Sequence, residues 1–343
     1  MKTKKRVVIV GGGFAGSYIA KNLENSFNVT LIDNKDFFEF TPSILRTLVE
    51  PSHILKIILY HKLYLKKTYV INGNVTSFDK THVIINKLKI PYDYLVIASG
   101  SKYIAPIKDE NIIMTSRSKD IRDSYNKLKK SKNILIVGGG LVGVELASEI
   151  ATKFKDKEIG LIDSNDRLIS RNPLKASKYV EKFLKKHKVK LILGEKLIEF
   201  KKGSYLTDKN KKINADLVYI CTGIIPNSEF IQKTNKYYLD EKNFLIVNEF
   251  LQINNKNIFG AGDIINIKEE KTAQNAEEHA KIIVKNIIRI EKNKSLKKYK
   301  SKPRIIALSL GKYNGLLIYK NFFIKGLIPA IIKSYIEKSF MRK

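Results

Sequence analysis

Two glycine-rich turns constrain the fold of this chain more than any other feature of the sequence. The first turn, Gly11–Gly16, reads GGGFAG and follows the β-branched run Val7–Val10. The second turn, Gly138–Gly143, reads GGGLVG and follows the apolar run Ile134–Val137. A helix-forming stretch follows each turn. A buried strand, a tight glycine turn and a helix N-terminus together form a cradle for a pyrophosphate. The sequence therefore predicts two such cradles.

An acidic residue ends the next predicted strand after each turn. Asp33 lies 17 residues beyond Gly16, and Asp163 ends the strand that begins at Glu158. A carboxylate in this place accepts hydrogen bonds from a ribose hydroxyl. One glycine turn is weak support for a binding site, because many such turns bind nothing. Two complete copies predict an α/β fold with two Rossmann-like dinucleotide-binding domains.

The two cradles are expected to hold different dinucleotides. A chain that starts directly with such a unit commonly keeps its permanent cofactor there, so we expect FAD in the first cradle. The second would then bind a nicotinamide dinucleotide. Asp163 favours NADH, since a carboxylate repels the 2′-phosphate of NADPH. Arg167 follows closely and would weaken that preference, so NADPH remains an alternative.

Cysteine content and the N-terminus indicate where the protein works. Cys221 is the only cysteine, which excludes a redox-active cysteine pair within one chain and fits a reducing compartment. The apolar run after Met1–Arg6 is too short for a signal peptide. No stretch approaches the roughly 20 apolar residues of a spanning helix. We therefore expect a cytoplasmic protein, or one on the cytoplasmic face of a membrane.

The net charge of +31 leaves three kinds of partner open: nucleic acid, anionic lipid and an acidic protein. A coding bias toward Lys, Ile and Asn also explains much of it. No helix-turn-helix, zinc or aromatic-basic signature is found, so no specific nucleic acid is expected. Residues 291–343 are the most basic segment, with 14 Lys and Arg against 2 Glu.

Three further motifs stand in a familiar order. They are Tyr94–Ser101, Tyr219–Gly223 and Asn257–Asp263. With the two cradles, they resemble the two-dinucleotide-domain flavoproteins related to the pyridine nucleotide-disulfide reductases, which have a glutathione-reductase-like fold. Within this group the chain looks most similar to type II NADH:quinone oxidoreductases and to apoptosis-inducing-factor-like ferroptosis suppressor proteins.

The resemblance implies a domain layout. Residues 1–110 and 240–290 would form a discontinuous FAD-binding domain, and residues 111–239 the NAD(P)H-binding domain. Residues 291–343 would form a small α+β segment. The residues implied for FAD are Gly11, Gly12, Gly13, Phe14, Ala15, Gly16, Asp33, Arg46, Val75, Ala98, Ser99, Gly100, Gly262 and Asp263. Those implied for the nicotinamide dinucleotide are Gly138, Gly140, Gly143, Asp163 and Gly223. Arg46 is equally explained as a solvated helix charge, and Val75 as an ordinary strand residue.

The electron acceptor is indicated by what surrounds the flavin in the family. The segment Phe37–Ser43 carries no thiol where disulfide reductases of this group have one, which disfavours disulfide and peroxide substrates. Thr272–His279 resembles the segment that type II NADH dehydrogenases place at the quinone pocket. Gln274 would bind a quinone carbonyl, and Glu278 would relay a proton. In the family a glutamate at the position of Glu145 lies close to nicotinamide and flavin. Plain solvated helix charges remain the alternative for both glutamates.

The C-terminal segment is predicted to end in a helix from near Pro329 to about Phe340. Ile328, Ile331 and Tyr335 recur at helical spacing, with Lys333 and Lys338 flanking them. Such a helix can lie in an anionic membrane interface. Packing on the core, or against a second copy in a homodimer, explains the same pattern.

The resemblance thus implies a non-proton-pumping, FAD-dependent NADH:quinone oxidoreductase. Hydride would pass from NADH to flavin N5, and two electrons would then pass to a quinone. A reductase for a ferredoxin-type electron carrier is the alternative, because the basic surface suits an acidic protein. A flavin-bound DNA-binding protein is the less favoured one.

Overall fold

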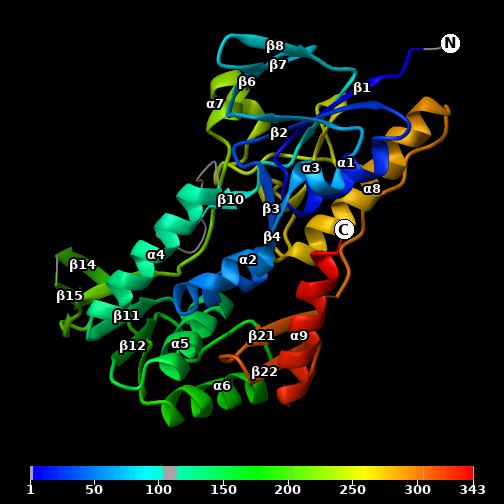
Figure 1. Ribbon diagram of the computed structural model, residues 1–343. Coiled ribbons are helices and arrows are strands. Elements are labelled where there is room, and N and C mark those ends of the chain that lie inside the picture. Colours follow the sequence, from blue (N-terminus) through cyan, green and yellow to red (C-terminus); the bar gives the residue numbers. More distant parts are fainter. Residues whose placement is uncertain (1–2, 103–113, 202, 304, 343) are drawn as a thin grey trace.

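The computed structural model describes residues 3–102, 114–201, 203–303 and 305–342. Two sheets built mainly of parallel strands lie one above the other, with the C-terminal segment alongside (Figure 1). The domain boundary expected between residues 110 and 111 lies outside the described residues. The predicted α/β class with two Rossmann-like units is confirmed.

The first sheet is built around β1, Arg6–Val10, whose last four residues are buried. Its parallel neighbours contact it in register, with Val8 opposite Thr30 on one side and Leu95 on the other. The strand order is β19 (Gln252–Ile253), β20 (Asn255–Gly260), β9 (Tyr94–Ile97), β1, β2 (Asn28–Asp33) and β5 (Tyr69–Asn72). The sheet therefore joins the N-terminal part of the chain to a part more than 150 residues later.

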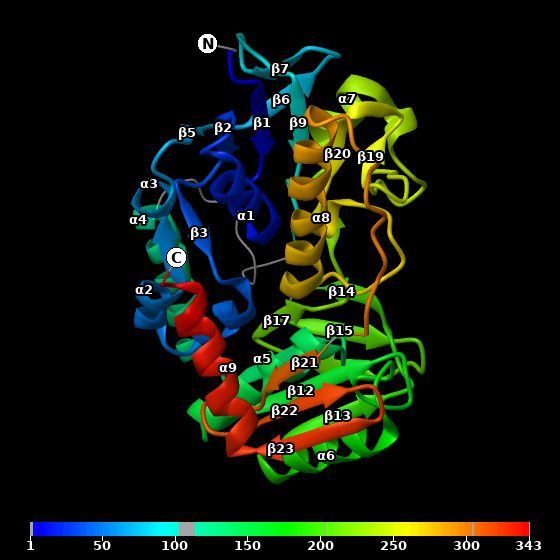
Figure 2. The ribbon, with the colours of Figure 1, turned by 90° about the vertical axis from the view of Figure 1, so that its right-hand side faces the viewer.

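Two helices lie side by side along this sheet (Figure 2). They are α1, Phe14–Leu23, which follows the first glycine turn, and α8, Ala273–Glu291. The Thr272 side chain caps α8 by accepting a hydrogen bond from the Asn275 N–H, and this satisfies one of the free donors of the first turn. A separate antiparallel sheet contains β6 (Val75–Phe78), β7 (His82–Ile85) and β8 (Leu88–Pro91).

The second parallel sheet repeats the first unit on a smaller scale. Its order is β13 (Val189–Leu193), β12 (Glu158–Asp163), β11 (Asn133–Val137) and β17 (Leu217–Ile220). Helix α5, Leu141–Lys153, follows the second glycine turn, and α6, Leu174–Lys186, precedes β13. A small antiparallel sheet of β14 (Leu197–Lys201), β15 (Ser204–Thr207) and β16 (Lys212–Asn214) adjoins it.

The C-terminal segment connects the two halves. The antiparallel strands are β21 (Ile305–Ser309), β22 (Gly315–Tyr319) and β23 (Phe322–Gly326). Helix α9, Leu327–Phe340, begins two residues earlier than expected, because Pro329 fits a first turn without losing a helical hydrogen bond. It leads from this sheet back to the first half (Figure 2), where the Phe340 ring lies 5.4 Å from both Phe14 and Phe40.

Shorter elements complete the described chain. They are β3 (Phe37–Glu39), η1 (Thr41–Leu48), η2 (Pro51–His53), α2 (Ile54–Ile57), β4 (Ile58–Tyr60), α3 (His61–Tyr64), β10 (Ser101–Lys102), α4 (Met114–Lys130), β18 (Ile225–Pro226), α7 (Glu229–Asn235), η3 (Lys236–Tyr238) and η4 (Gly262–Ile264). Among the helices of the described residues, none has both the length and the apolar character needed to cross a bilayer.

Candidate functional site

The two glycine turns have the same geometry. Gly11 and Gly138, the first residue of each, have φ of +100° and +110°, values that residues with a side chain rarely adopt. A Cβ on Gly16 would overlap the carbonyl oxygen of Gly11, and one on Gly143 would overlap that of Gly138. Helix and turn can approach this closely only because both positions are glycine.

Gly13 and Gly140 face open space instead. A Cβ built on either residue meets no atom within 4 Å, and both have an ordinary φ of −72°. They are the N-caps of α1 and α5, and no side chain caps these helices. The free N–H groups of a helix N-terminus thus face space that a diphosphate can fill. The residues present therefore fit the phosphates of FAD and of a nicotinamide dinucleotide.

The acids of both cradles point back at their own turns. The Gly12 N–H donates to Asp33 Oδ2, and the Gly139 N–H donates to Asp163 Oδ2. Asp33 Oδ1 also accepts from the Lys35 N–H at 2.9 Å. Burial opposes ionisation of Asp33, but its contacts with His61 and Lys35 outweigh that effect and hold the pKa of the carboxyl below its ordinary value. Both carboxylates are thus placed for the predicted ribose contact, which the structure does not test.

Most of the other residues predicted for FAD gather at the carboxyl end of the first sheet. The Ala98 N–H donates to the Val10 carbonyl at 2.8 Å, which places Ala98, Ser99 and Gly100 directly beside the first turn. Asp263 accepts from the Ser101 hydroxyl at 2.7 Å. Sites of open α/β sheets form at this edge.

Some of the other predicted cofactor residues have defined packing or hydrogen-bond partners, and others do not. Ala15 is buried in α1, and the Phe14 ring packs edge-on against Phe38 at 5.1 Å. Gly262 has φ of +78°, and its N–H donates to His279 Nδ1 at 3.2 Å. Two more residues, Val75 at the start of β6 and Gly223 with φ of +132°, have no contact that tests their predicted role.

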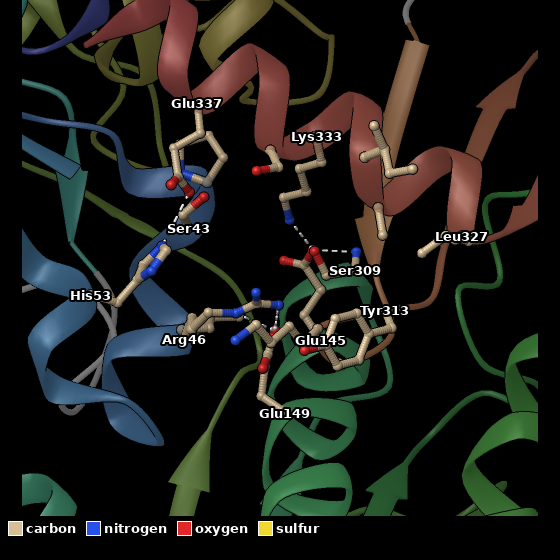
Figure 3. A pocket seen from close by; sticks show the side chains of 17 residues that line it. Ser43, Arg46, His53, Glu145, Glu149, Ser309, Tyr313, Leu327, Lys333 and Glu337 are labelled. Carbon is tan, nitrogen blue, oxygen red and sulfur yellow. Dashed lines mark hydrogen bonds and ion pairs between the residues drawn. The ribbon is translucent and has the colours of Figure 1, made fainter. Parts of the chain in front are cut away.

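A cavity of about 250 Å³ lies where both halves and the C-terminal segment meet (Figure 3). Glu145 and Glu149 of α5 point into it from the second half. Arg46 of η1 reaches across from the first half and donates to Glu149 Oε1 through its Nη2 at 2.6 Å and its Nε at 3.2 Å. Arg46, predicted as an FAD contact, therefore pairs across the two halves in this structure. Its contact with FAD remains a prediction.

Glu145 is held by the C-terminal segment. Its Oε1 accepts a hydrogen bond from the Ser309 N–H at 2.7 Å and another from Lys333 Nζ. Lys333, expected beside the apolar residues of this helix, points inward, and its side chain is only 12% exposed, which does not fit a lysine at a membrane interface. A buried ammonium needs a counter-charge, and Glu145 supplies it.

Glu337 makes the matching contact to the first half. His53 Nε2 lies 3.1 Å from Glu337 Oε2, and both side chains are nearly buried. Burial raises the pKa of the Glu337 carboxyl, but hydrogen bonds from His53 and Ser43 outweigh this and hold the pKa below its ordinary value. One polar side-chain contact therefore fastens α9 to each half of the molecule, Lys333 to Glu145 and Glu337 to His53.

The two residues predicted for a quinone lie in the first turns of α8. Gln274 is exposed, while Glu278 accepts a hydrogen bond from Lys281 at 2.8 Å and lies 3.5 Å from Lys302. The Lys281 hydrogen bond and the charges of both lysines hold the pKa of Glu278 below its ordinary value despite some burial. An ionised carboxylate holds no proton to donate, so the proton relay is the less favourable of its two predicted roles.

Cys221 is a core residue. It is buried at 7% exposure, and burial raises the pKa of its thiol to about 12. A thiol with this pKa is protonated at neutral pH and is not a nucleophile.

The sequence did not indicate the cavity residues Glu149, His53, Lys333 and Glu337. Glu149 had a usable signal, because it lies four residues after Glu145 and shares its helix face. The other three come from separate elements, and only the folded chain brings them together.

The described chain thus has two glycine cradles, each with an acid facing its turn, and a cavity between its two halves. The family model described as pyridine nucleotide-disulphide oxidoreductase matches residues 5–280, and the chain belongs to that family. Membership implies binding of FAD and NAD(P)H.

Two curated relatives match nearly the full length. Apoptosis-inducing factor homolog B of Dictyostelium discoideum is 35% identical over 91% of this chain and 89% of its own length. Ferroptosis suppressor protein 1 of Taeniopygia guttata is 32% identical over 98% and 95%. The predicted resemblance to this group is confirmed.

Two solved structures share the fold. The sulfide:quinone oxidoreductase of Aquifex aeolicus aligns with a TM-score of 0.85 at 21% identity, over 99% of this chain and 91% of that one. NDH2 of Plasmodium falciparum in complex with NADH aligns with a TM-score of 0.83 at 17% identity, over 98% and 95%.

Proposed function

We propose that this protein is an FAD-dependent NADH:quinone oxidoreductase. The observation that carries the proposal is the cavity at which α5, η1 and α9 meet. It combines the paired charges of Glu145, Arg46 and their partners with an apolar wall from Leu327 and Ile331. A pocket that joins an apolar wall to polar and charged groups at fixed positions can orient a flat ring with two carbonyl oxygens.

FAD, when bound in the first cradle, would accept a hydride from the nicotinamide and pass two electrons to the acceptor. The chain supplies placement. Gly13 and Gly140 leave room for the two diphosphates, and Asp33 and Asp163 would bind a ribose each. Glu145, fixed by Ser309 and Lys333, would orient the polar group of whichever ring enters the cavity.

NADH is the proposed reductant. With the coenzyme in the second cradle, the Asp163 carboxylate would lie where NADPH carries its extra phosphate. Arg167 does not offset this, because its guanidinium donates to the Asn172 carbonyl at 2.9 Å and to Ser177 at 2.7 Å. Its other terminal nitrogen donates to the Ser170 carbonyl.

Steady-state oxidation of NADH by the purified FAD-loaded protein tests the function. A soluble quinone should be reduced with a kcat/KM at least about 100-fold above that for a ferredoxin. This is the size of discrimination expected between a substrate that fits a specific pocket and one that does not. Faster reduction of the ferredoxin would favour the electron-carrier alternative. Retention on DNA that falls with salt, without NADH turnover, would favour the flavin-bound DNA-binding alternative.

We also propose that the C-terminal segment rests on an anionic membrane surface, which would give access to a lipid-soluble quinone. Its exposed apolar side chains are Phe322, Ile324, Leu327, Ile328, Ile331 and Tyr335, each more than half exposed. We call this set the apolar C-terminal face. Exposed lysines border it at positions 320, 325 and 338. Apolar side chains rimmed by cations suit an interface with anionic lipid.

Sedimentation with lipid vesicles tests this second proposal. The protein should bind vesicles containing phosphatidylglycerol and bind pure phosphatidylcholine weakly. Replacing Ile328 and Ile331 by Ser should abolish binding. Leu88→Ser is the matched control, because Leu88 and Ile328 are both 59% exposed but Leu88 lies on β8. Equal binding of both variants, or concentration-dependent dimers without vesicle binding, would contradict the proposal.

A further inference from the structure

A histidine without an assigned role lies against the first cradle. His61, the first residue of α3, is fully buried, and a Cβ on Gly12 would come within 2.5 Å of its ring. The ring therefore fills the space behind the glycine turn. Its Nε2 lies 3.7 Å from Asp33 Oδ2 and has no hydrogen-bond partner among the described residues.

The other ring nitrogen is engaged. His61 Nδ1 lies 2.7 Å from the hydroxyl of Tyr64. Burial raises the pKa of Tyr64, so this phenol remains protonated and can donate to Nδ1. When Nδ1 accepts, the ring proton is on Nε2. The edge that faces Asp33 is then a donor.

The second cradle has no such group. Behind Gly139 the corresponding space is filled by Leu168, whose Cδ2 would lie 2.5 Å from an added Cβ. Asp163 is instead held from the solvent side, where Asn165 donates to Oδ1 through its N–H and its side-chain amide, both at 2.7 Å. The same backbone turn thus has a polar support in one cradle and an apolar one in the other.

We propose that His61 is a positioning residue for FAD. Tyr64 fixes the tautomer of the ring, and His61 then supports the Asp33 carboxylate from behind. In this position the carboxylate can accept hydrogen bonds from the adenosine ribose hydroxyls. A buried, unpaired N–H is costly. Nε2 lies 3.7 Å from Asp33 Oδ2, so a small movement of the carboxylate toward the ring would pair this N–H. The inference depends on FAD occupying the first cradle, and it does not depend on the identity of the acceptor.

Flavin binding, measured without any acceptor, tests the inference. His61→Leu places in the first cradle the residue type that the second cradle already accommodates at Leu168. Apoprotein titrated with FAD should bind about 10- to 100-fold more weakly in this variant, as expected for one lost hydrogen bond to a charged group. The dissociation constant for NADH should change less than about twofold, within the usual independence of separate sites.

Two further variants separate support of Asp33 from simple packing. His61→Gln keeps a donor and should recover most of the FAD affinity. Tyr64→Phe keeps the aromatic ring at position 64 but removes the hydroxyl that fixes the tautomer of His61. This variant should bind FAD about 3- to 10-fold more weakly. The inference is overturned if His61→Leu binds FAD like the unaltered protein. It is also overturned if His61→Gln is no better than His61→Leu, or if the NADH affinity falls equally. These binding measurements do not require turnover, so they test the role of His61 even if the protein does not reduce a quinone.

Discussion

The two cradles have nearly identical backbones and differ in what supports them. In the first, Asp33 is buried and has the His61–Tyr64 pair behind it. In the second, Asp163 is partly exposed and has Leu168 behind it. A buried polar support favours a cofactor that stays, whereas an open, apolar-backed site suits a coenzyme that must leave after each turnover. The glycine pattern specifies that a dinucleotide binds, and the surroundings would set how long it remains.

The largest expected effect comes from filling each cradle with the same side chain. Gly13→Val and Gly140→Val both place a side chain in open space at an ordinary φ, so both proteins should fold. Gly13→Val should be purified without flavin. Gly140→Val should keep its flavin but lose about 100-fold in kcat/KM for NADH, the cost of overlapping the diphosphate.

Flavin absorbance and NADH kinetics check this pair of variants. The melting temperature of each apoprotein is the control for folding. If either substitution affected both ligands equally, the cradles would not be separate sites.

The second effect concerns the two acids. Asp163→Ser should raise the ratio of kcat/KM for NADPH to that for NADH by about 30-fold, because a close like-charge contact with phosphate costs a few kcal/mol. Asp33→Ser should leave that ratio unchanged and weaken FAD retention. Steady-state kinetics with both coenzymes gives the ratio. An unchanged ratio in Asp163→Ser would mean that the 2′-phosphate of NADPH does not bind next to residue 163.

A smaller effect is expected at the cavity. Glu145→Gln should lower kcat by about 10-fold with flavin content unchanged, because the side chain keeps its place but loses the charge opposite Lys333. Lys333→Met should have a similar effect, and the double variant should be no worse than either single one, as for two groups that act as a unit. Additive losses in the double variant would show that the two side chains act separately.

The smallest effect is on stability and depends on pH. Glu337→Gln should lower the melting temperature by about 2 °C at neutral pH, equivalent to about 1 kcal/mol for one hydrogen bond to a charged group. The pKa of Glu337 is lowered in the fold from its ordinary value of 4.5. Its stabilisation is therefore complete above that pH and is lost as the pH falls through the folded-state value.

Thermal unfolding between pH 7 and pH 3 measures the difference between Glu337→Gln and the unaltered protein. The difference should shrink in acid. Ser339→Ala, an exposed change on the same helix, is the control and should show no such trend. A constant difference at all pH values would mean that the His53–Glu337 pair does not stabilise α9.

The cradles could be predicted because their signals are local. A strand, a turn and a helix N-terminus need only neighbouring residues, and the positions of Gly11, Gly16 and Asp33 follow from backbone sterics. The end of α9 was likewise close to the expected residue. Lys333 was misplaced for a physical reason: helical spacing gives the face on which a residue lies, but not which neighbour covers that face.

The sequence by itself determined the α/β class, the two dinucleotide sites and the absence of any cysteine-pair chemistry within the chain, because each depends on residue type and short-range spacing. The tertiary structure alone decided that Arg46 meets Glu149, that Lys333 meets Glu145, and that His61 lies behind Asp33. Those contacts join segments far apart in the chain. Their formation depends on how three packed units fit against one another, which no local pattern encodes.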